Sequence, residues 1–474
     1  MLATLLLTLL LVLLSCVIGQ GLLVVCGSDR WRWWAPALGF AVLLVVGGQV
    51  IRIPHHATTG AIAIVVLFVA ALLLPGTWRG LRQAGPGALV LGVVVLLLSA
   101  IPLFAAGHVG TFGESVSNDM SSHLTGAWWI RTHIGLRPAA AIGGTLIETG
   151  YPMGGHGIVA ALVALTGQGE VRSFDALQMA VPILTAFTAY AALPRSFPGG
   201  RWVVAGLIGV CYLPIAFLAQ GLFKETIQSM LVLGAAVALG DLMTATPRGW
   251  WGRLRLGVPY GVIAAAGIYN YSYAGAFWMI GTGGLVLLIA FLRARGRRIA
   301  QIKAGWLPVL VAVLVGAVLV VPEIHRMTAF ANSLFGVEPK RNHGNLPHAV
   351  NPFEALGVWL SGDFRRSSDP IWPSIALQVI AGLALFAGLP WWWKRRRLGP
   401  PAAALVAVVI WVDLAVTRNI YNAAKGLVIV GPVTLLCIAG PLLAAWSPQA
   451  RAAVRRPLLA VARAVAVVVL LGAV

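Results

Sequence analysis

Long apolar runs separated by short polar segments dominate the pattern of this chain. A helix needs about 20 mostly apolar residues to cross the hydrocarbon core of a bilayer, and runs of that kind recur from end to end. The pattern predicts an all-α fold, a polytopic transmembrane helical bundle of about 14 spans. The predicted spans are 2–25, 35–51, 60–75, 87–106, 174–194, 202–220, 226–243, 257–270, 273–292, 305–322, 371–393, 400–417, 424–446 and 458–474.

The composition supports the membrane interpretation. Hydrophobic residues make up 59% of the chain and charged residues 10%, against roughly 25% charged residues in a soluble domain. The net charge of +20 comes from short clusters between apolar runs, such as 293–303 and 394–397. A nucleic-acid-binding protein carries a continuous basic surface instead, so we expect no nucleic acid as partner.

The charge clusters also predict an orientation. With the N-terminus outside, the loops around Arg30, Arg79, Arg195, Arg248, Arg293, Lys394 and Arg451 become cytoplasmic. These loops hold most of the 34 basic residues, while Asp29 and Asp241 are the acidic residues on that side. Basic residues in short loops mark the cytoplasmic side. We therefore expect a multi-pass protein of the plasma (inner) membrane, surrounded by membrane lipids.

Two segments on the other side are too long to be simple connectors. The chain divides accordingly into N-terminal helices (1–106), an extracytoplasmic catalytic loop with juxtamembrane helices (107–173), further transmembrane helices (174–322), a second extracytoplasmic loop (323–370) and C-terminal helices (371–474). Within the first loop, the apolar piece 156–166 follows Tyr-Pro-Met-Gly-Gly and is too short to span. It predicts an interfacial or re-entrant helix.

The first long loop holds the strongest candidates for chemistry. Asp119 and His123 are four residues apart in SNDMSSHLTGAWWI and share one face if this segment is helical. A carboxylate and an imidazole on one face can hold a divalent cation, or act as a base with its partner. Alternatively, Asn118 or Asp119 only caps the helix. The sequence leaves both interpretations open.

Other candidates lie at the outer ends of predicted helices. Tyr151 and His156 flank a tight turn, and His156 is a candidate for the cavity of Asp119, although a lone histidine is more often structural. Lys224 and Glu225 begin a span, where burying a charge is costly and favours function; snorkelling to the interface is the alternative. Glu225 is a second acidic metal ligand or a partner for sugar hydroxyls.

Basic residues on the outer side run against the orientation rule, so we expect several of them to neutralise the phosphate of a lipid head group. Contact with ordinary anionic phospholipid is the alternative. Candidate substrate-binding residues are Asn118, His123, Tyr151, His156, Lys224, Tyr269, Asn270, Arg341, His343 and Arg418. Candidate ligands for a divalent cation (Mg, Mn or Ca) are Asp119, Glu225 and His123.

Taken together, these features resemble the GT-C superfamily of integral membrane glycosyltransferases. The resemblance lies in an acidic residue in the first large outer loop, a nearby histidine, a Tyr-Pro-x-Gly-x-His turn and the spans that follow, over roughly residues 85–290. The Ala/Val/Arg-rich composition is similar to actinobacterial cell-envelope members, the arabinosyl- and mannosyltransferases. The pair Asn118-Asp119, instead of two carboxylates, and the several spans before the loop depart from the simplest members.

The resemblance implies an activity and site roles. A hexosyl or pentosyl group would pass, with inversion, from a polyprenyl-phosphate sugar donor to a glycan or lipid acceptor of the cell wall, on the extracytoplasmic face. Asp119 would be the general base on the acceptor hydroxyl, and Glu225 would help to bind a metal. Basic residues of later outer loops would hold the donor phosphate.

Three other functions compete. A lipid-linked sugar transporter or flippase fits the number of spans, but such proteins place polar groups at mid-depth within the spans, whereas here they gather at the outer face. An O-antigen-type polymerase or ligase would use arginines and a histidine of the later loop, such as Arg341, His343, Arg365 and Arg366. A non-enzymatic scaffold is the weakest alternative.

Overall fold

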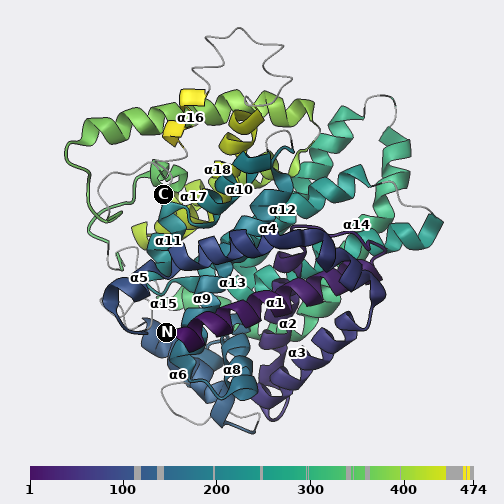
Figure 1. Cartoon of the computed structure of the whole chain (residues 1–474), viewed down its shortest axis with the longest axis vertical. Coiled ribbons are helices and arrows are strands. Elements are labelled where there is room, and N and C mark those ends of the chain that lie inside the picture. Colours follow the sequence, from purple (N-terminus) through teal and green to yellow (C-terminus); the bar gives the residue numbers. More distant parts are fainter. Residues whose placement is uncertain are drawn as a thin grey trace.

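The computed structural model describes residues 1–110, 119–135, 144–195, 198–245, 249–294, 296, 298–337, 343–344, 346–357, 363–395, 397–444, 463–465 and 467–469. Within these ranges all regular structure is helical and there is no β-strand (Figure 1). The all-α prediction is confirmed to this extent. Apolar runs of this length favour helices because a helix pairs its backbone polar groups within one segment.

Nine helices of the described ranges are long and apolar enough to cross a membrane, or ten if the bent pair α10–α11 counts as one span. The chain is therefore a helical, multi-pass membrane protein. The nine are α1 (Leu2–Val25), α2 (Ala35–Gln49) with η1 (Val50–Arg52), α4 (Pro75–Ser99), α12 (Phe223–Thr244), α13 (Gly249–Arg293), α14 (Arg298–Val320), α16 (Ile371–Lys394), α17 (Gly399–Thr417) and α18 (Ile420–Ala444); the bent pair is α10 (Pro198–Gly209) and α11 (Tyr212–Ala219).

The number is lower than the fourteen predicted spans for identifiable reasons. Helix α13 joins two predicted spans, which meet at a break where Tyr271 and Ser272 leave helical geometry. Helix α3 (His56–Leu72) has 17 residues, and α9 (Glu170–Ala192) carries charged residues in its first turns. The predicted span 458–474 lies almost wholly outside the described residues. The count of fourteen stays a prediction, although a helix occupies the position of every predicted span before residue 447.

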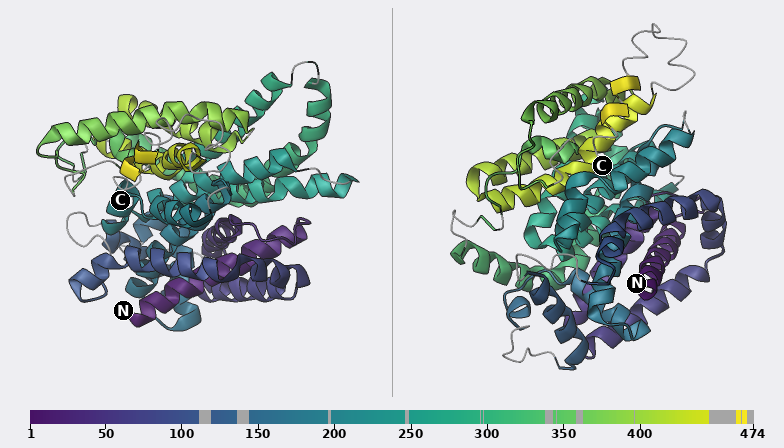
Figure 2. Two further views of the ribbon diagram at one scale, coloured as in Figure 1. Left: turned by 45° about the horizontal axis from the view of Figure 1, so that its top comes forward. Right: turned by 60° about the vertical axis from the view of Figure 1, so that its left-hand side comes forward.

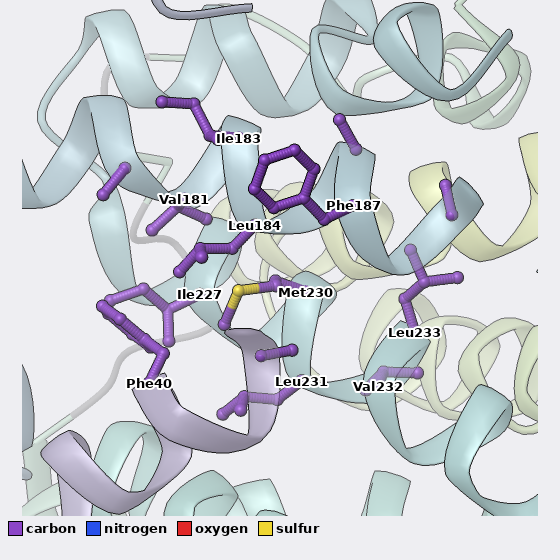
Figure 3. Packing of buried hydrophobic residues seen from close by; sticks show 14 of the residues in the cluster. Phe40, Val181, Ile183, Leu184, Phe187, Ile227, Met230, Leu231, Val232 and Leu233 are labelled. Atoms are coloured by element: carbon purple, nitrogen blue, oxygen red, sulfur yellow. The ribbon is translucent and has the colours of Figure 1, made fainter. Parts of the chain in front are cut away.

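The centre of the bundle is formed by α2, α9, α12 and α18. The apolar stretch of α18 is 89% buried and that of α12 is 78% buried, whereas that of α14 with its continuation to Ser333 is only 17% buried. Figure 3 shows Phe40 of α2 with Leu184 of α9 and Met230 of α12 in this core. Helices α4, α14 and α16 lie further out and expose apolar side chains, as lipid-facing helices do (Figure 2).

The segments that connect the helices lie at two ends of the bundle, as the contacts between them show. At one end, called the basic end below, segments predicted to be cytoplasmic meet: Arg79 and Asp29 are 3.5 Å apart, Trp34 donates a 2.8 Å hydrogen bond to Asp241, and Arg397 donates one of 3.4 Å to the carbonyl of Ala192. Which side of the membrane this end faces stays a prediction.

The opposite end, called the loop end, gathers the segments predicted to be outer. The backbone amide of His55 donates to the carbonyl of Ile134 at 3.2 Å, and the rings of Phe217 and Phe364 lie 4.9 Å apart. In Figure 1 the N-terminus, α5 (Ile101–Ala106), α6 (Asp119–Thr132), α11 and α15 (Ile324–Val337) all lie at the left of the molecule. The segment between α6 and α9 adds α7 (Gly144–Glu148) and α8 (Gly154–Thr166).

Helix α8 corresponds to the short apolar piece predicted to be interfacial or re-entrant. Every residue from Gly154 to Val163 is buried, and the helix packs against α2, α3, α6 and α9. A helix lying on a membrane surface buries one face in lipid, whereas α8 is enclosed by protein on all sides. Its closest approach is to α2, where a Cβ atom on Gly157 would lie 1.9 Å from the carbonyl oxygen of Gly47.

We expect Gly157→Ala to lower the free energy of unfolding by about 1–3 kcal/mol, because the added methyl forces α8 away from α2. The measurement is the melting temperature of the purified protein in detergent. Gly305→Ala in α14 is the matched control, since nothing lies within 4 Å of a Cβ atom there. Equal melting temperatures for the two variants would show that α2 and α8 do not pack through these glycines.

The predicted orientation is testable with introduced cysteines. Thr149 near the loop end and Arg253 near the basic end are both exposed. In a background without the four native cysteines, a membrane-impermeant maleimide added to intact cells should label Thr149→Cys but not Arg253→Cys, which requires permeabilised cells. The reverse pattern would invert the orientation, and labelling of both in intact cells would contradict the span assignment between them.

Candidate functional site

Helix α6 carries the first candidate residues into the bundle. It extends from Asp119 to Thr132, so the described part of SNDMSSHLTGAWWI is helical and meets the condition under which Asp119 and His123 share one face. Its buried residues Met120, His123, Ala127 and Ile130 recur at three- and four-residue intervals, which directs one face of α6 toward α8 and α9. Asn118 and the side chain of Asp119 lie outside what the structure describes, so the roles proposed for them stay predictions.

His123 pairs with His156 of α8 in a buried contact. Nδ1 of His123 lies 3.0 Å from Nε2 of His156, and both side chains are almost completely buried. Burial lowers the pKa of His156 to about 3, helped by the positive charge of Lys224. Burial also lowers the pKa of His123 well below its usual range, helped by His156 and Lys224. Two neutral rings share one hydrogen bond, so the pair is uncharged near neutral pH.

Tyr151 connects the histidine pair to a charged cluster. Its ring lies 5.6 Å from the ring of His123 and 6.0 Å from that of His156. On its other side, Nζ of Lys224 lies 3.8 Å from the centre of the Tyr151 ring and 5.5 Å from that of Tyr271. Aromatic faces attract a cation, so the two tyrosines hold the ammonium group of Lys224 at the first turn of α12.

Glu225, the next residue, is 1% exposed and has two partners from other spans. The hydroxyl of Tyr271 donates a 3.0 Å hydrogen bond to Oε1, and Nζ of Lys425 of α18 lies 3.9 Å from the same oxygen. The second oxygen, Oε2, is buried and has no hydrogen-bond partner among the described residues. We call Lys224, Glu225, Tyr271 and Lys425 the lysine–glutamate cluster; it holds two cationic groups against one anionic group.

The break in α13 places Tyr271 and Asn270 against α12. Ser272 has a φ of 55°, a backbone conformation that residues other than glycine seldom adopt. The side-chain amide of Asn270 donates to the carbonyl of Lys224 at 2.8 Å and to Oε1 of Gln228 at 3.2 Å. Asn270 therefore lies at the cluster and fixes the start of α12, while its role in substrate binding stays a prediction. His343 and Arg418 are exposed, and Arg341 lies outside the described residues, so the roles proposed for these three residues stay predictions.

Tyr269 lies between three helices of the bundle. Its hydroxyl donates a 2.7 Å hydrogen bond to the carbonyl of Leu319 and accepts one from the side chain of Gln49. It thus joins α13 to α2 and α14, and its ring is completely buried. The contacts recorded for Tyr269 are structural, so its role in substrate binding has no support from them.

Arg326 fixes the turn that carries Tyr151. Its guanidinium donates to the carbonyls of Ile147 at 2.9 Å and Tyr151 at 2.7 Å. The same group lies 3.5 Å from Glu323, a buried carboxylate that also pairs with Arg52 after α2. Arg52–Glu323–Arg326, called the ion triad below, therefore joins three distant segments at the loop end. Bonds from arginine to carbonyls and carboxylates are strong and directional.

Metal binding depends on a side chain that is not described. The described residues contain no group of three His, Cys, Asp or Glu side chains placed to hold an ion. Glu225 already has Lys425 and Tyr271 on one oxygen, which makes Lys425 its counter-charge. Because Asp119 was expected to complete the set with His123 and Glu225, a divalent cation stays a prediction.

Two residues of the lysine–glutamate cluster and one of the ion triad were not among the predicted site residues. Lys425, Tyr271 and Arg326 were visible as polar groups of the outer ends, but only their partners distinguish them from snorkelling side chains. Asp175 of α9 is a further buried carboxylate, and its neighbour one turn on, Gln178, contacts Met120 of α6. In the sequence, Asp175 is recognisable only as a charged residue near the start of an apolar run, and a role in stabilising the start of a helix explains such a charge equally well.

No known protein family matches this sequence, and a comparison with characterised proteins finds no match either.

The buried histidines predict a pH dependence of stability. Both pKa values are lowered from the ordinary value of 6.5. Below about pH 6.5 the unfolded chain therefore binds more protons than the folded one, and the free energy of unfolding decreases as the pH decreases. We expect the melting temperature to drop between about pH 7 and pH 5, and His156→Phe to reduce this slope. The exposed His325→Gln is the control; an equal slope in all three proteins would contradict a neutral buried pair.

Proposed function

We propose that the chain is an integral membrane glycosyltransferase that uses a polyprenyl-phosphate sugar as donor. The observation that carries the proposal is the lysine–glutamate cluster beside the helix that begins at Asp119. Lys224 and Lys425 place two ammonium groups at the loop end, beside the buried carboxylate of Glu225, and ionisable groups at the mouth of a span favour a functional role. They would attract the anionic phosphate of the donor, whose lipid tail would remain in the bilayer.

The cluster suits the leaving group of such a transfer. When the bond between the anomeric carbon and the phosphate oxygen breaks, its electron pair and a developing negative charge pass to the lipid phosphate. Lys224 and Lys425 are fixed before the reaction by Tyr151, Tyr271 and Glu225. Preorganised cations stabilise developing charge without reorganising in the transition state.

The acceptor requires a base on the other side of the sugar. In the proposed mechanism the carboxylate of Asp119 takes the proton of an acceptor hydroxyl while the hydroxyl oxygen bonds to the anomeric carbon. A single displacement of this kind inverts the configuration at that carbon. The buried Oε2 of Glu225, which has no hydrogen-bond partner among the described residues, would accept a hydrogen bond from a sugar hydroxyl. A divalent cation, if bound, would supply further charge stabilisation of the phosphate.

The polymerase or ligase alternative has one observation in its favour. Gly344, next to His343, packs against the ring of Tyr421, whose face lies 4.1 Å from Nζ of Lys425. The second long loop therefore reaches the same cluster. A ligase would use this loop, rather than Asp119, for chemistry on the same class of lipid-linked substrate.

The decisive measurement is sugar transfer by the purified protein from a radiolabelled polyprenyl-phosphate sugar to a cell-envelope acceptor. Loss of a general base typically costs 10²–10⁴-fold, so we expect Asp119→Asn to reduce transfer by about that factor. Lys224→Gln should raise the KM for the donor, because a phosphate contact is lost. The exposed Asp369→Asn in the second loop is the matched control and should transfer at the normal rate.

The same assay separates the alternatives. Full transfer by Asp119→Asn would remove its catalytic role. If Arg341→Ala and His343→Ala abolish transfer while Asp119→Asn does not, the polymerase or ligase hypothesis replaces the present one. Movement of the lipid-linked sugar across vesicles without transfer would favour a flippase.

A further inference from the structure

An apolar slot runs between α12, α13 and α14, away from the candidate site. It is a cavity of about 410 Å³ whose walls include Leu242, Ile268, Leu287, Pro308 and Val320. It opens sideways between Ile280, which is 71% exposed, and Val313, which is 61% exposed. These residues belong to spans, so the opening faces the hydrocarbon of the membrane.

The length of the slot fits a lipid chain. Its walls on α14 extend from Pro308 to Val320, which at about 1.5 Å per residue is roughly 18 Å along the helix axis. The hydrocarbon core of a bilayer is about 30 Å thick, so one leaflet supplies chains of comparable length. Glycine and alanine residues along α13 and α14 leave the space open; Gly284, for example, has nothing within 4 Å of a Cβ atom.

A smaller polar pocket of about 80 Å³ adjoins the slot at the basic end. Leu242 and Tyr260 are walls of both cavities. The polar pocket is also lined by Arg32, Arg255 and Asp241. Asp241 accepts the hydrogen bond of Trp34 and lies 3.4 Å from Arg32, whereas Arg255 has no ion pair with any described residue.

We propose that the slot and the polar pocket together bind one anionic phospholipid of the leaflet at the basic end. An acyl chain occupies the slot, and the lipid phosphate lies between Arg32 and Arg255. The two arginines against one carboxylate leave a positive charge where the head group lies. A basic residue near an anionic membrane surface contributes about 1 kcal/mol to lipid binding, which distinguishes an anionic lipid from a zwitterionic one.

The position of the charge selects this lipid over the proposed sugar donor. The donor phosphate would lie at the loop end, with Lys224 and Lys425, whereas Arg32 and Arg255 of the polar pocket lie at the basic end. The lipid site is thus separate from the candidate site, and its existence does not depend on the proposed transfer activity.

Native mass spectrometry of the purified protein tests the site with phosphatidylglycerol, phosphatidylcholine of the same chains, glycerophosphate and a polyprenyl phosphate. We expect phosphatidylglycerol to bind about fivefold more tightly than phosphatidylcholine. Arg255→Gln should abolish this preference, and Gly284→Leu, which fills the slot, should weaken both lipids. The matched controls are Arg253→Gln, on the same helix but outside the pocket, and Gly305→Leu, which also adds a side chain in open space.

Three outcomes would overturn the proposal. Equal binding of the two phospholipids, unaffected by Arg255→Gln, would indicate nonspecific lipid contact. Binding of glycerophosphate as tightly as the lipid would make the pocket a site for a free phosphate. If Gly284→Leu weakens the binding of polyprenyl phosphate and Arg255→Gln does not, the slot holds the lipid tail of the donor, which would enter from the loop end.

Discussion

Glu323 buries a carboxylate between two guanidinium groups that come from distant parts of the chain, and the loop end depends on this contact. Arg52 follows α2, while Arg326 follows Glu323 by one helical turn and donates to the turn before α8. Removing one partner of a buried ion group leaves a charge uncompensated, which is strongly destabilising. The ion triad therefore holds Tyr151 in place, and through Tyr151 it sets the position of Lys224 and of the histidine pair.

The bilayer explains why polar groups gather where they do. Inside the bundle, hydroxyl groups such as those of Ser15 and Thr188 donate to carbonyls one turn back in their own helix, which satisfies them without a second segment. Charged groups have no such local solution and collect at the two ends, where partners from other helices meet them. The lysine–glutamate cluster is the place where this arrangement leaves one oxygen of Glu225 without a described partner.

Much of the fold could be predicted because the bilayer imposes length and polarity on each segment separately. The apolar runs predicted the position of each described helix before residue 447 that corresponds to a span, and the segment considered as a helix in the first long loop is α6. The sequence made His156 a candidate for the cavity of Asp119 and His123, but the direct hydrogen bond between the two histidines, which belong to α8 and α6, was not predicted. Pairing between distant segments, as in Glu225 with Lys425 or Tyr269 with Leu319, leaves no trace in local spacing.

The break at Tyr271 and Ser272 replaces an outer loop with a reversal of the chain that needs almost no length. Asn270 and Tyr271, on one side of that reversal, both contact the first turn of α12. The same two residues therefore fix the position of α13 and the positions of Lys224 and Glu225. A junction of this kind has no loop residues that could absorb an insertion or a deletion. Whereas the long loops can gain or lose residues during evolution without moving the bundle, a residue inserted here would displace Asn270 or Tyr271 from the first turn of α12.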